Sequence, residues 1–230
     1  MKITSRGGVI SVREACQSLG FDPTKEFAIQ GFGNAGQRAA LLHKEILGGG
    51  KLISVSDSRG AIYNKDGFDP IDLVQHKLKT GTVLNFLGAK QIAHEDLLEL
   101  DVEVLYPAAL ENAIHSKNAN KIKARIVCEL ANGPTTPEAD IILFKKGVHV
   151  IPDILASAGG VIVSYFEMVQ DKSLYFWEEE EVHQRLDKKM TLAYARVKEA
   201  IKEKKIHPRL AAMIVGVARV AEACKLRGWV

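Results

Sequence analysis

Short runs of apolar residues alternate along this chain with stretches in which apolar side chains recur at helical spacing. Runs rich in Val, Ile and Leu lie at 26–30, 51–56, 102–106, 125–130 and 148–151. Their length and near-continuous apolar character predict strands buried on both faces. Because neighbouring parallel strands need a crossover connection, usually a helix, the alternation predicts an α/β fold with a doubly wound parallel sheet and helices on both of its faces.

The helices are predicted from apolar spacing together with start and stop residues. Ser11 followed by Glu14 has the pattern of a capping box, and Asp69 before Pro70 has the pattern of a helix start. Residues 64–67 are interpreted as a turn. The predicted helices cover residues 12–19, 34–47, 70–80, 95–100, 112–120, 137–146, 160–170, 178–203 and 207–227.

The order of these elements indicates a single domain over residues 1–230. Residues 1–20 supply an N-terminal helix, and the strands stop before residue 158. Residues 172–230 are then predicted to form a helical C-terminal tail. The acidic run at 178–181 suits the start of its long helix, because carboxylates interact favourably with the positive end of the helix dipole.

Composition excludes several classes of protein. The 31 Lys and Arg residues against 28 Asp and Glu leave a net charge of only +3, spread along the chain, which argues against a nucleic-acid binder. No apolar stretch reaches the roughly 20 residues of a membrane span, so no membrane partner is expected. Cys16, Cys128 and Cys224 lie far apart, which predicts reduced thiols and neither a disulfide framework nor a metal site. The first residues resemble no targeting segment, and we expect a cytoplasmic protein.

The strongest chemical signal is a glycine-rich loop. Gly31, Gly33 and Gly36 follow a predicted strand and open a predicted helix, and the next strand ends at Asp57, about 20 residues further along. In a dinucleotide-binding loop the first glycine permits a tight turn, the second lets the backbone approach the pyrophosphate, and the third lets helix and strand pack closely. The pattern predicts a Rossmann-type site for NAD or NADP.

The choice between the two cofactors depends on the residues after the second strand. Asp57 would accept hydrogen bonds from a ribose 2′-hydroxyl and repel a 2′-phosphate, which favours NAD. Arg59 lies two residues further on and could pair with a 2′-phosphate. We therefore expect NAD to be preferred, with NADP left open.

Three further loops of small residues follow predicted strands. They contain Pro107-Ala108-Ala109, Asn132-Gly133-Pro134 and Ala156-Ser157-Ala158-Gly159-Gly160. Each alone suits a tight strand-to-helix turn. Because the carboxyl ends of parallel strands share one edge of the sheet, the three together predict a crevice for a flat ligand.

Several longer segments resemble the coenzyme domain of the glutamate dehydrogenases, in the hexameric branch of the amino-acid dehydrogenase superfamily. They are GFGNAGQ from Gly31, VSDSRGAIYN from Val55, PAALENAIH from Pro107, ELANGPTTPEAD from Glu129 and PDILASAGGVIVSYFE from Pro152. The resemblance runs along nearly the whole chain. It implies hydride transfer from L-glutamate to NAD(P), which yields 2-oxoglutarate, ammonia and NAD(P)H.

The resemblance also implies roles for single residues. Ser164 matches the serine that reaches the substrate carboxylate, and Thr4 matches a threonine that contacts the cofactor carboxamide. Asn132 and Ser157 correspond to contacts with the nicotinamide end, although position 157 is usually asparagine in the family and a serine has a shorter reach. The remaining cofactor contacts are expected at Gly31, Phe32, Gly33, Asn34, Ala35, Gly36, Asp57, Ser58, Arg59, Ala108 and Ala109.

No catalytic residue is assigned within this chain. In the family a preceding substrate domain carries the catalytic lysine, the catalytic aspartate and the glutamate pocket, and amine oxidation needs positioned proton acceptors and donors. The resemblance therefore implies that this chain binds dinucleotide without turning over glutamate. It also implies that the C-terminal helices pack toward that domain, so we expect self-association through the last helix, or a loosened helix, when its apolar face is uncovered.

Three alternatives remain open. A regulatory module could bind NAD on the same fold without catalysis, because fold does not decide function. A related dehydrogenase for leucine, valine or phenylalanine would share this half of the molecule. An S-adenosylmethionine methyltransferase also uses a glycine loop and a strand-end acid, but the segments from Glu129 and Pro152 argue against it.

Overall fold

The computed structural model describes residues 2–229, with side chains from Thr4 onward. A seven-stranded sheet in the order β4-β3-β2-β1-β5-β6-β7 forms its centre. The strands are β1 (Glu26–Gln30), β2 (Lys51–Asp57), β3 (Gly60–Phe68), β4 (Lys90–Ile92), β5 (Val104–Pro107), β6 (Ile126–Cys128) and β7 (His149–Ile151). The strands β2, β1, β5, β6 and β7 run parallel, which confirms the predicted α/β architecture.

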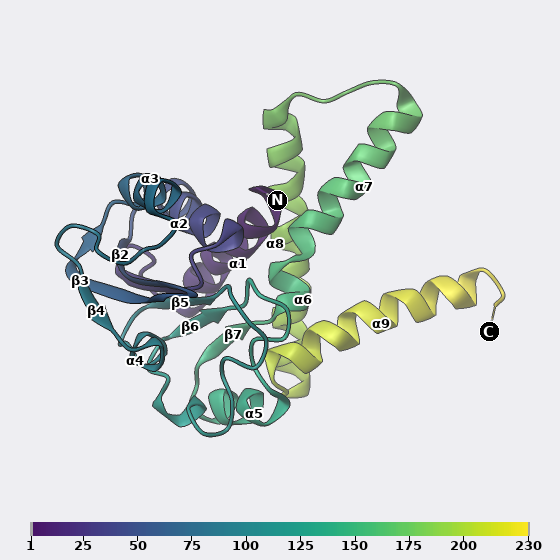
Figure 1. The fold of residues 1–230 in the computed structure, drawn as a ribbon. Coiled ribbons are helices and arrows are strands. Elements are labelled where there is room, and N and C mark those ends of the chain that lie inside the picture. The colour runs from purple at the N-terminus through teal and green to yellow at the C-terminus, as the bar shows by residue number, and fades with distance from the viewer. Residues whose placement is uncertain (1, 230) are drawn as a thin grey trace.

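Helices cover both faces of this sheet, as Figure 1 shows. The apolar core is divided into two clusters, one with residues of α1, α2, α7 and α8, the other with residues of α4 and α5. The helices are α1 (Lys2–Leu19), α2 (Asn34–Leu47), α3 (Pro70–Thr80), α4 (His94–Leu98), α5 (Pro137–Lys145), α6 (Asp153–Ala156), α7 (Ala158–Ser173), α8 (Glu179–Lys204) and α9 (Pro208–Leu226), and a 3-10 turn η1 spans Ala119–Lys121.

Two strands at one edge depart from the all-parallel prediction. β3 and β4 are antiparallel to their neighbours, and the sequence pattern predicts neither of these strands. Residues 64–67, predicted as a turn, lie within β3 and interrupt its register with β2. The Asn64 side chain accepts a hydrogen bond from the Asp66 N–H and donates one to the Gly67 carbonyl, and Gly67 has a positive φ. The turn chemistry is therefore real, but it forms a bulge inside a strand.

One predicted helix begins too late, and another predicted helix does not form. α1 begins ten residues before the predicted 12, and the Ser11 hydroxyl donates to the Gly7 carbonyl within the helix, so Ser11 is no cap. Glycines 7 and 8 stay helical because α1 packs closely on the first turn of α7, where a Cβ at Gly7 would lie 3.0 Å from Gly159 Cα. The predicted helix at 112–120 is mostly loop, because Asn118 bonds backbone groups of residues 113 and 115 in place of a helical ladder.

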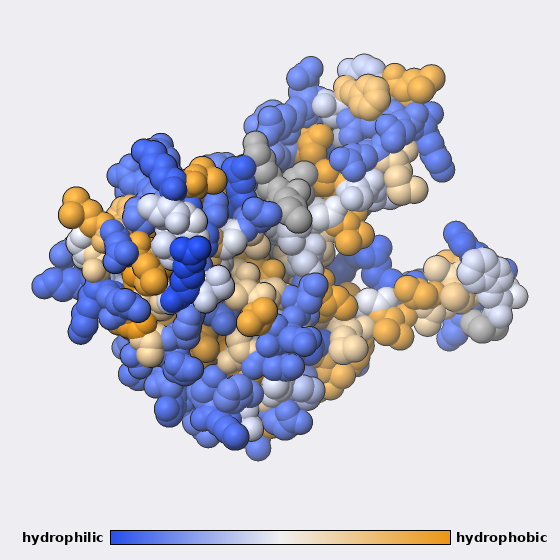
Figure 2. Space-filling model, in the orientation of Figure 1, coloured by the Kyte–Doolittle hydropathy of each residue, from blue (hydrophilic) through white to orange (hydrophobic). Residues whose placement is uncertain are grey.

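The C-terminal helices extend the fold beyond the sheet. α7 and α8 form a hairpin whose connecting loop is exposed, and α9 leaves the body beside β7 and α6 (Figure 1). Only the first turns of α9 are buried, at Pro208, Ala211 and Ala212. Apolar side chains gather along α9 and at the α7–α8 tip in Figure 2. Within residues 2–229 no helix is both long enough and apolar enough to cross a membrane.

Candidate functional site

The glycine loop joins β1 to α2 at the carboxyl edge of the sheet. Gly31 has φ +94°, and a Cβ there would lie 2.8 Å from the backbone N of Ala109. At Gly36 a Cβ would lie 2.1 Å from the carbonyl oxygen of Gly31. At Gly33 a Cβ would meet nothing within 4 Å. Two of the glycines are thus required by backbone packing, whereas the third keeps open the space in front of the helix.

The first turn of α2 faces this open space. Gly33 is the N-cap and has no side chain with which to bond the helix N–H groups. A helix N-terminus with this geometry attracts an anion. The Phe32 side chain is fully buried in the core, so only its backbone is available to a ligand. Its N–H donates to the Ser56 carbonyl at 2.6 Å, and the N–H of Gly31 donates to the Ser56 hydroxyl at 3.1 Å, which holds the loop on β2.

Asp57 ends β2 beside the loop, and most of its carboxylate is already engaged. One oxygen accepts from the Arg59 N–H at 2.9 Å, and the other accepts from Lys77 Nζ at 3.0 Å and from the Val83 N–H at 2.8 Å. Burial raises the pKa of Asp57, but these donors outweigh it and hold the pKa below its ordinary value. Asp57 is therefore ionised, and its charge is offset by Lys77.

A cleft of about 660 Å³ lies against the glycine loop, within the range of small-molecule sites. It brings together seven of the predicted cofactor residues: Gly31, Phe32, Gly33, Asp57, Ser58, Ala108 and Ala109. It also contains five residues that the sequence did not single out: Gln30, Ser56, Lys77, His94 and Leu110. Arg59 is exposed next to this cleft and has no ion-pair partner within the described residues.

The place of Gln30 at the cleft could have been predicted from the sequence, whereas that of Lys77 could not. Gln30 is the last residue of β1, directly before Gly31, so its position at the carboxyl edge could have been predicted. Its Oε1 is buried with no hydrogen-bond partner within residues 2–229. Lys77 lies in the last turn of α3 and reaches Asp57 only through tertiary folding. No local pattern marks it.

Asn132 and Ser157 lie further along the same edge, after β6 and beside α6. Asn132 is exposed, and the N–H of the next residue, Gly133, donates to Asp153 at 2.8 Å. The Ser157 hydroxyl donates to the carbonyl of Asp153, so its proton is already used within the protein. Asp153 thus bonds Ser157 directly and holds Asn132 through the neighbouring Gly133.

Thr4 and Ser164 are placed by α1 and α7. A Cβ at Gly160 would lie 2.9 Å from Thr4 Oγ1, so Thr4 packs against the first turn of α7. The neighbouring Ser5 hydroxyl donates to the Ala35 carbonyl, which brings the start of α1 beside the start of α2. Ser164 is exposed on α7. Neither Thr4 nor Ser164 lines the cleft at the glycine loop.

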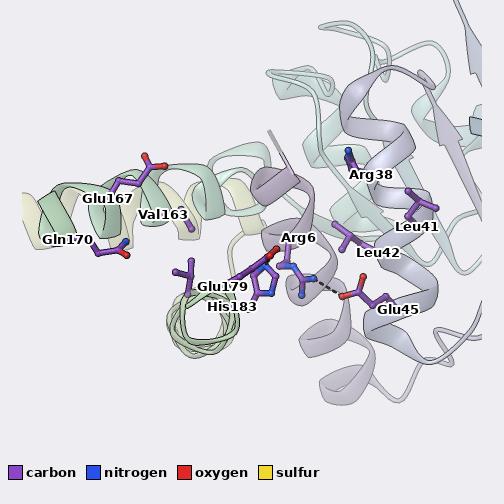
Figure 3. Close-up of a pocket in the computed structure, with 11 residues that line it drawn as sticks. Arg6, Arg38, Leu41, Leu42, Glu45, Val163, Glu167, Gln170, Glu179 and His183 are labelled. Carbon is purple, nitrogen blue, oxygen red and sulfur yellow. Dashed lines mark hydrogen bonds and ion pairs between the residues drawn. The ribbon is translucent and has the colours of Figure 1, made fainter. Parts of the chain in front are cut away.

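A second cleft of about 450 Å³ lies between α1, α2, α7 and α8 (Figure 3). It contains none of the predicted cofactor residues. Arg6 pairs with Glu45 at 2.6 Å, and further carboxylates from Glu167 and Glu179 line the same space. Because its charges are mixed and its best-placed arginine is paired, it does not have the chemistry of an anion site.

No cluster of His, Cys, Asp and Glu among residues 4–229 could hold a metal ion. The three cysteines are free, and burial raises the pKa of Cys16 to about 12 and that of Cys128 well above its ordinary value. Both are therefore neutral, unreactive thiols. Cys224 is partly exposed.

Comparison with known proteins identifies the family. Residues 1–228 match the model of the Glutamate/Leucine/Phenylalanine/Valine dehydrogenase family. The chain is 51% identical over 226 residues to a glutamate dehydrogenase of Thermotoga maritima and 44% identical over 227 residues to an NAD-specific glutamate dehydrogenase of Staphylococcus aureus. Each alignment covers 98% of this chain and 54% of the relative, so the chain spans about half the length of these relatives.

Solved structures agree with this match. The hetero-hexameric glutamate dehydrogenase of Thermus thermophilus superposes with a TM-score of 0.90 at 29% identity, over 98% of this chain and 53% of that one. The glutamate dehydrogenase of Peptoniphilus asaccharolyticus superposes with a TM-score of 0.84 at 34% identity, over 100% of this chain and 54% of that one. The chain therefore belongs to the Glutamate/Leucine/Phenylalanine/Valine dehydrogenase family.

Proposed function

We propose that residues 1–230 hold the nicotinamide dinucleotide for the NAD(P)-dependent oxidation of L-glutamate to 2-oxoglutarate and ammonia. The observation that carries the proposal is the contrast among three glycines. Backbone packing requires Gly31 and Gly36, whereas nothing in the protein requires Gly33 to lack a side chain. A pyrophosphate passing close to the backbone would require it.

The residues at this edge fit a dinucleotide. The pyrophosphate would lie over Gly33 at the positive end of α2, with the adenosine between Asp57 and the Ala108–Ala109 turn. The buried Gln30 Oε1 has no partner within the described residues and faces the same cleft, so it offers an acceptor to a ligand hydroxyl. These features support cofactor binding independently of the relatives' names.

When bound, the cofactor supplies hydride acceptance and donation. The residues of this chain would bind and orient it. Asn132 and Ser157 would hold the nicotinamide end of the cofactor. Thr4 would contact its carboxamide, and Ser164 would reach the substrate carboxylate. The exposed position of Ser164 on α7 leaves its hydroxyl accessible.

Glutamate is favoured as the substrate by the similar proteins. Both relatives compared above are glutamate dehydrogenases, at 51% and 44% identity. A tryptophan dehydrogenase of Nostoc punctiforme superposes with a TM-score of only 0.70, against 0.90 for the Thermus enzyme. These comparisons also argue against a purely regulatory NAD-binding module.

We further propose that the 230 residues alone bind cofactor without turnover. The titratable side chains lining the cleft at the glycine loop are Asp57, Lys77 and His94, and the first two are paired with each other near the adenosine end. Thr4, Asn132, Ser157 and Ser164 cannot accept the proton that an ammonium group must lose. Glutamate-dependent NADH formation by the purified chain, at rates near those of a complete dehydrogenase, would refute this.

NAD is the proposed preferred cofactor, and NADP is accepted more weakly. Asp57 is ionised and lies at the ribose end, but Lys77 at 3.0 Å offsets its charge. The exposed Arg59 adds a second cation that could pair with a 2′-phosphate. The two cations reduce the repulsion that would otherwise exclude NADP.

The exposed face of α9 supports the proposal that the chain self-associates. Met213, Val217 and Val220 are 51%, 67% and 65% exposed and lie at helical spacing. Burial of these side chains against a second copy would remove apolar surface from water. Light scattering over a range of concentrations tests this. A monomeric mass at every concentration, for the unaltered chain and for Val217→Glu alike, contradicts it.

Titration with NADH and NADPH, followed by ligand fluorescence, is the experiment that tests the function. Gly33→Val should abolish binding of both cofactors because its side chain fills the open space before α2. Gly216→Val is the matched control, because a Cβ at Gly216 in α9 would also meet nothing within 4 Å. Unchanged binding by Gly33→Val, or absence of binding by the unaltered chain, would refute the assignment.

A further inference from the structure

Arg209, in the first turn of α9, contacts three carboxylates from three parts of the fold. Its guanidinium donates to Glu129 at 2.6 Å, to Asp140 at 2.5 Å and to Asp153 at 2.9 Å. Glu129 follows β6, Asp140 lies in α5, and Asp153 is the first residue of α6. The Glu129 and Asp140 side chains are 0% and 3% exposed, and Arg209 itself is 18% exposed.

Asp153 connects this cluster to the edge of the sheet. One carboxylate oxygen accepts from Arg209 and from the Ile154 N–H, and the other accepts from the Gly133 N–H at 2.8 Å. The Asp153 N–H donates to Glu129 at 2.8 Å, and its carbonyl accepts from both the N–H and the hydroxyl of Ser157. Asp153 therefore holds the Asn132–Gly133 turn on one side and the Ser157 turn on the other.

These two turns carry the residues proposed to contact the nicotinamide end of the dinucleotide. We infer that Asp153 and Arg209 are positioning residues for that end, and that they couple the orientation of α9 to its occupancy. The inference rests on the proposed cofactor site. Neither residue lines the cleft at the glycine loop, so they would act through Asn132 and Ser157.

The coupling follows from geometry and charge. A guanidinium with donors in a rigid fork can satisfy three carboxylates only in one orientation, so a displacement of the first turn of α9 breaks bonds to β6, α5 and α6 together. A ligand that fixes the Asn132 and Ser157 turns must then also stabilise the start of α9. By reciprocity, fixing α9 must strengthen binding at the nicotinamide end to the same degree.

Asp153→Asn is the sharpest variant. An asparagine has one oxygen where aspartate has two, so its amide group would face either Gly133 N–H or Arg209, both of which are donors. Arg209→Lys is the second variant, because it keeps the charge but loses the fork. Arg209→Ala is avoided because it would leave three carboxylates without a cation, so a loss of binding could come from a loss of folding. The matched control is Asp187→Asn, since Asp187 accepts from Arg13 in a comparable fork between α1 and α8.

The test measures NADH and ADP-ribose affinities of the full chain by calorimetry. ADP-ribose has the adenosine, pyrophosphate and both riboses but lacks the nicotinamide. Asp153→Asn and Arg209→Lys should weaken NADH at least tenfold while ADP-ribose changes less than twofold, and Asp187→Asn should change neither. NADH, but not ADP-ribose, should slow amide exchange in residues 207–214 of the unaltered chain, and this protection should be lost in Asp153→Asn.

The outcomes separate this inference from the proposed function. Failure of the unaltered chain to bind either ligand overturns the cofactor site and the inference with it. Normal ligand binding by the unaltered chain, with NADH affinity unchanged in Asp153→Asn, overturns the positioning role alone. Equal losses of NADH and ADP-ribose affinity in the variants also overturn it, because the effect would then not belong to the nicotinamide end.

Discussion

Gly36→Ala should destabilise the fold far more than Gly33→Ala, although the two glycines lie three residues apart in one loop. A Cβ at Gly36 would lie 2.1 Å from the carbonyl oxygen of Gly31 and 3.0 Å from Ile29 Cγ2. Carbon and oxygen atoms normally approach no closer than about 3.3 Å, so α2 must retreat from β1 by about 1 Å. Neither contact partner is the flexible end of a long side chain.

The magnitude follows from the cost of overpacking. Extra carbon atoms in a well-packed interface cost about 1–3 kcal/mol and sometimes more. Because the nearest atom at Gly36 is backbone, we expect about 3 kcal/mol. At Gly33 the added methyl meets nothing within 4 Å and φ is −83°, so the backbone conformation suits alanine. The weaker N-cap preference of alanine and the smaller entropy of its unfolded chain offset each other, which leaves a change within about 1 kcal/mol.

Urea unfolding followed by far-ultraviolet circular dichroism measures both variants. With a slope of about 3 kcal/mol per M, the expected loss lowers the midpoint of Gly36→Ala by about 1 M. Gly33→Ala should keep its midpoint and instead lose affinity for NADH. Equal midpoints for the two variants would refute the reasoning, because the close approach of α2 to β1 would then not constrain Gly36.

Three further results are expected. Burial lowers the pKa of His43 to about 4 from an unfolded value near 6.5, so the folded protein requires the neutral imidazole. The unfolding free energy should therefore fall by about 3 kcal/mol from this group as the pH drops from 6.5 to 4. Urea midpoints measured at several pH values should depend less steeply on pH in His43→Gln. Lys77→Met should weaken the affinity for NADPH at least fivefold relative to that for NADH, because the Asp57 charge is then no longer offset. An unchanged ratio of the two affinities in fluorescence titrations would show that Lys77 does not contribute to the choice of cofactor. Lys146 donates to the carbonyls of residues 119, 120 and 122, so Lys146→Met should lower the unfolding free energy by about 1–2 kcal/mol. Its neighbour Lys145 is also exposed but makes no such bonds to the described residues, so Lys145→Met should change the unfolding free energy by less than about 0.5 kcal/mol. Similar thermal midpoints for the two lysine variants would contradict this.

The sequence alone determined the parts of this protein that depend on neighbouring residues. Apolar runs and helical spacing located β1, β2, β5, β6 and β7 and most of the helices that follow them. Parallel crossovers then placed the glycine loop, Asp57 and the Ala108–Ala109 turn at one edge, where the cleft brings them together. Turn chemistry, strand periodicity and crossover handedness are local rules, so these predictions did not require knowledge of distant contacts.

Local patterns were misleading where tertiary packing outweighed them. The Ser11 and Glu14 pattern predicted a cap, but α1 extends back to Lys2 because it is packed against α2, α6 and α7. Residues 64–67 have turn chemistry, yet they form a bulge in β3 because β2 pairs with the residues on both sides of them, at Tyr63 and Phe68. Propensity amounts to less than about 1 kcal/mol per residue, which such packing readily exceeds.

Only the tertiary structure determined which charged groups meet. Lys77 reaches Asp57 from α3, and Arg209 reaches Glu129 across 80 positions of sequence. No periodicity encodes these pairs, because each half-buried cation meets its carboxylates only after the helices have packed together. The sequence therefore indicated where a dinucleotide would lie. The folded chain determined how the charge of Asp57 is offset and how α9 is tied to the Asn132 and Ser157 turns.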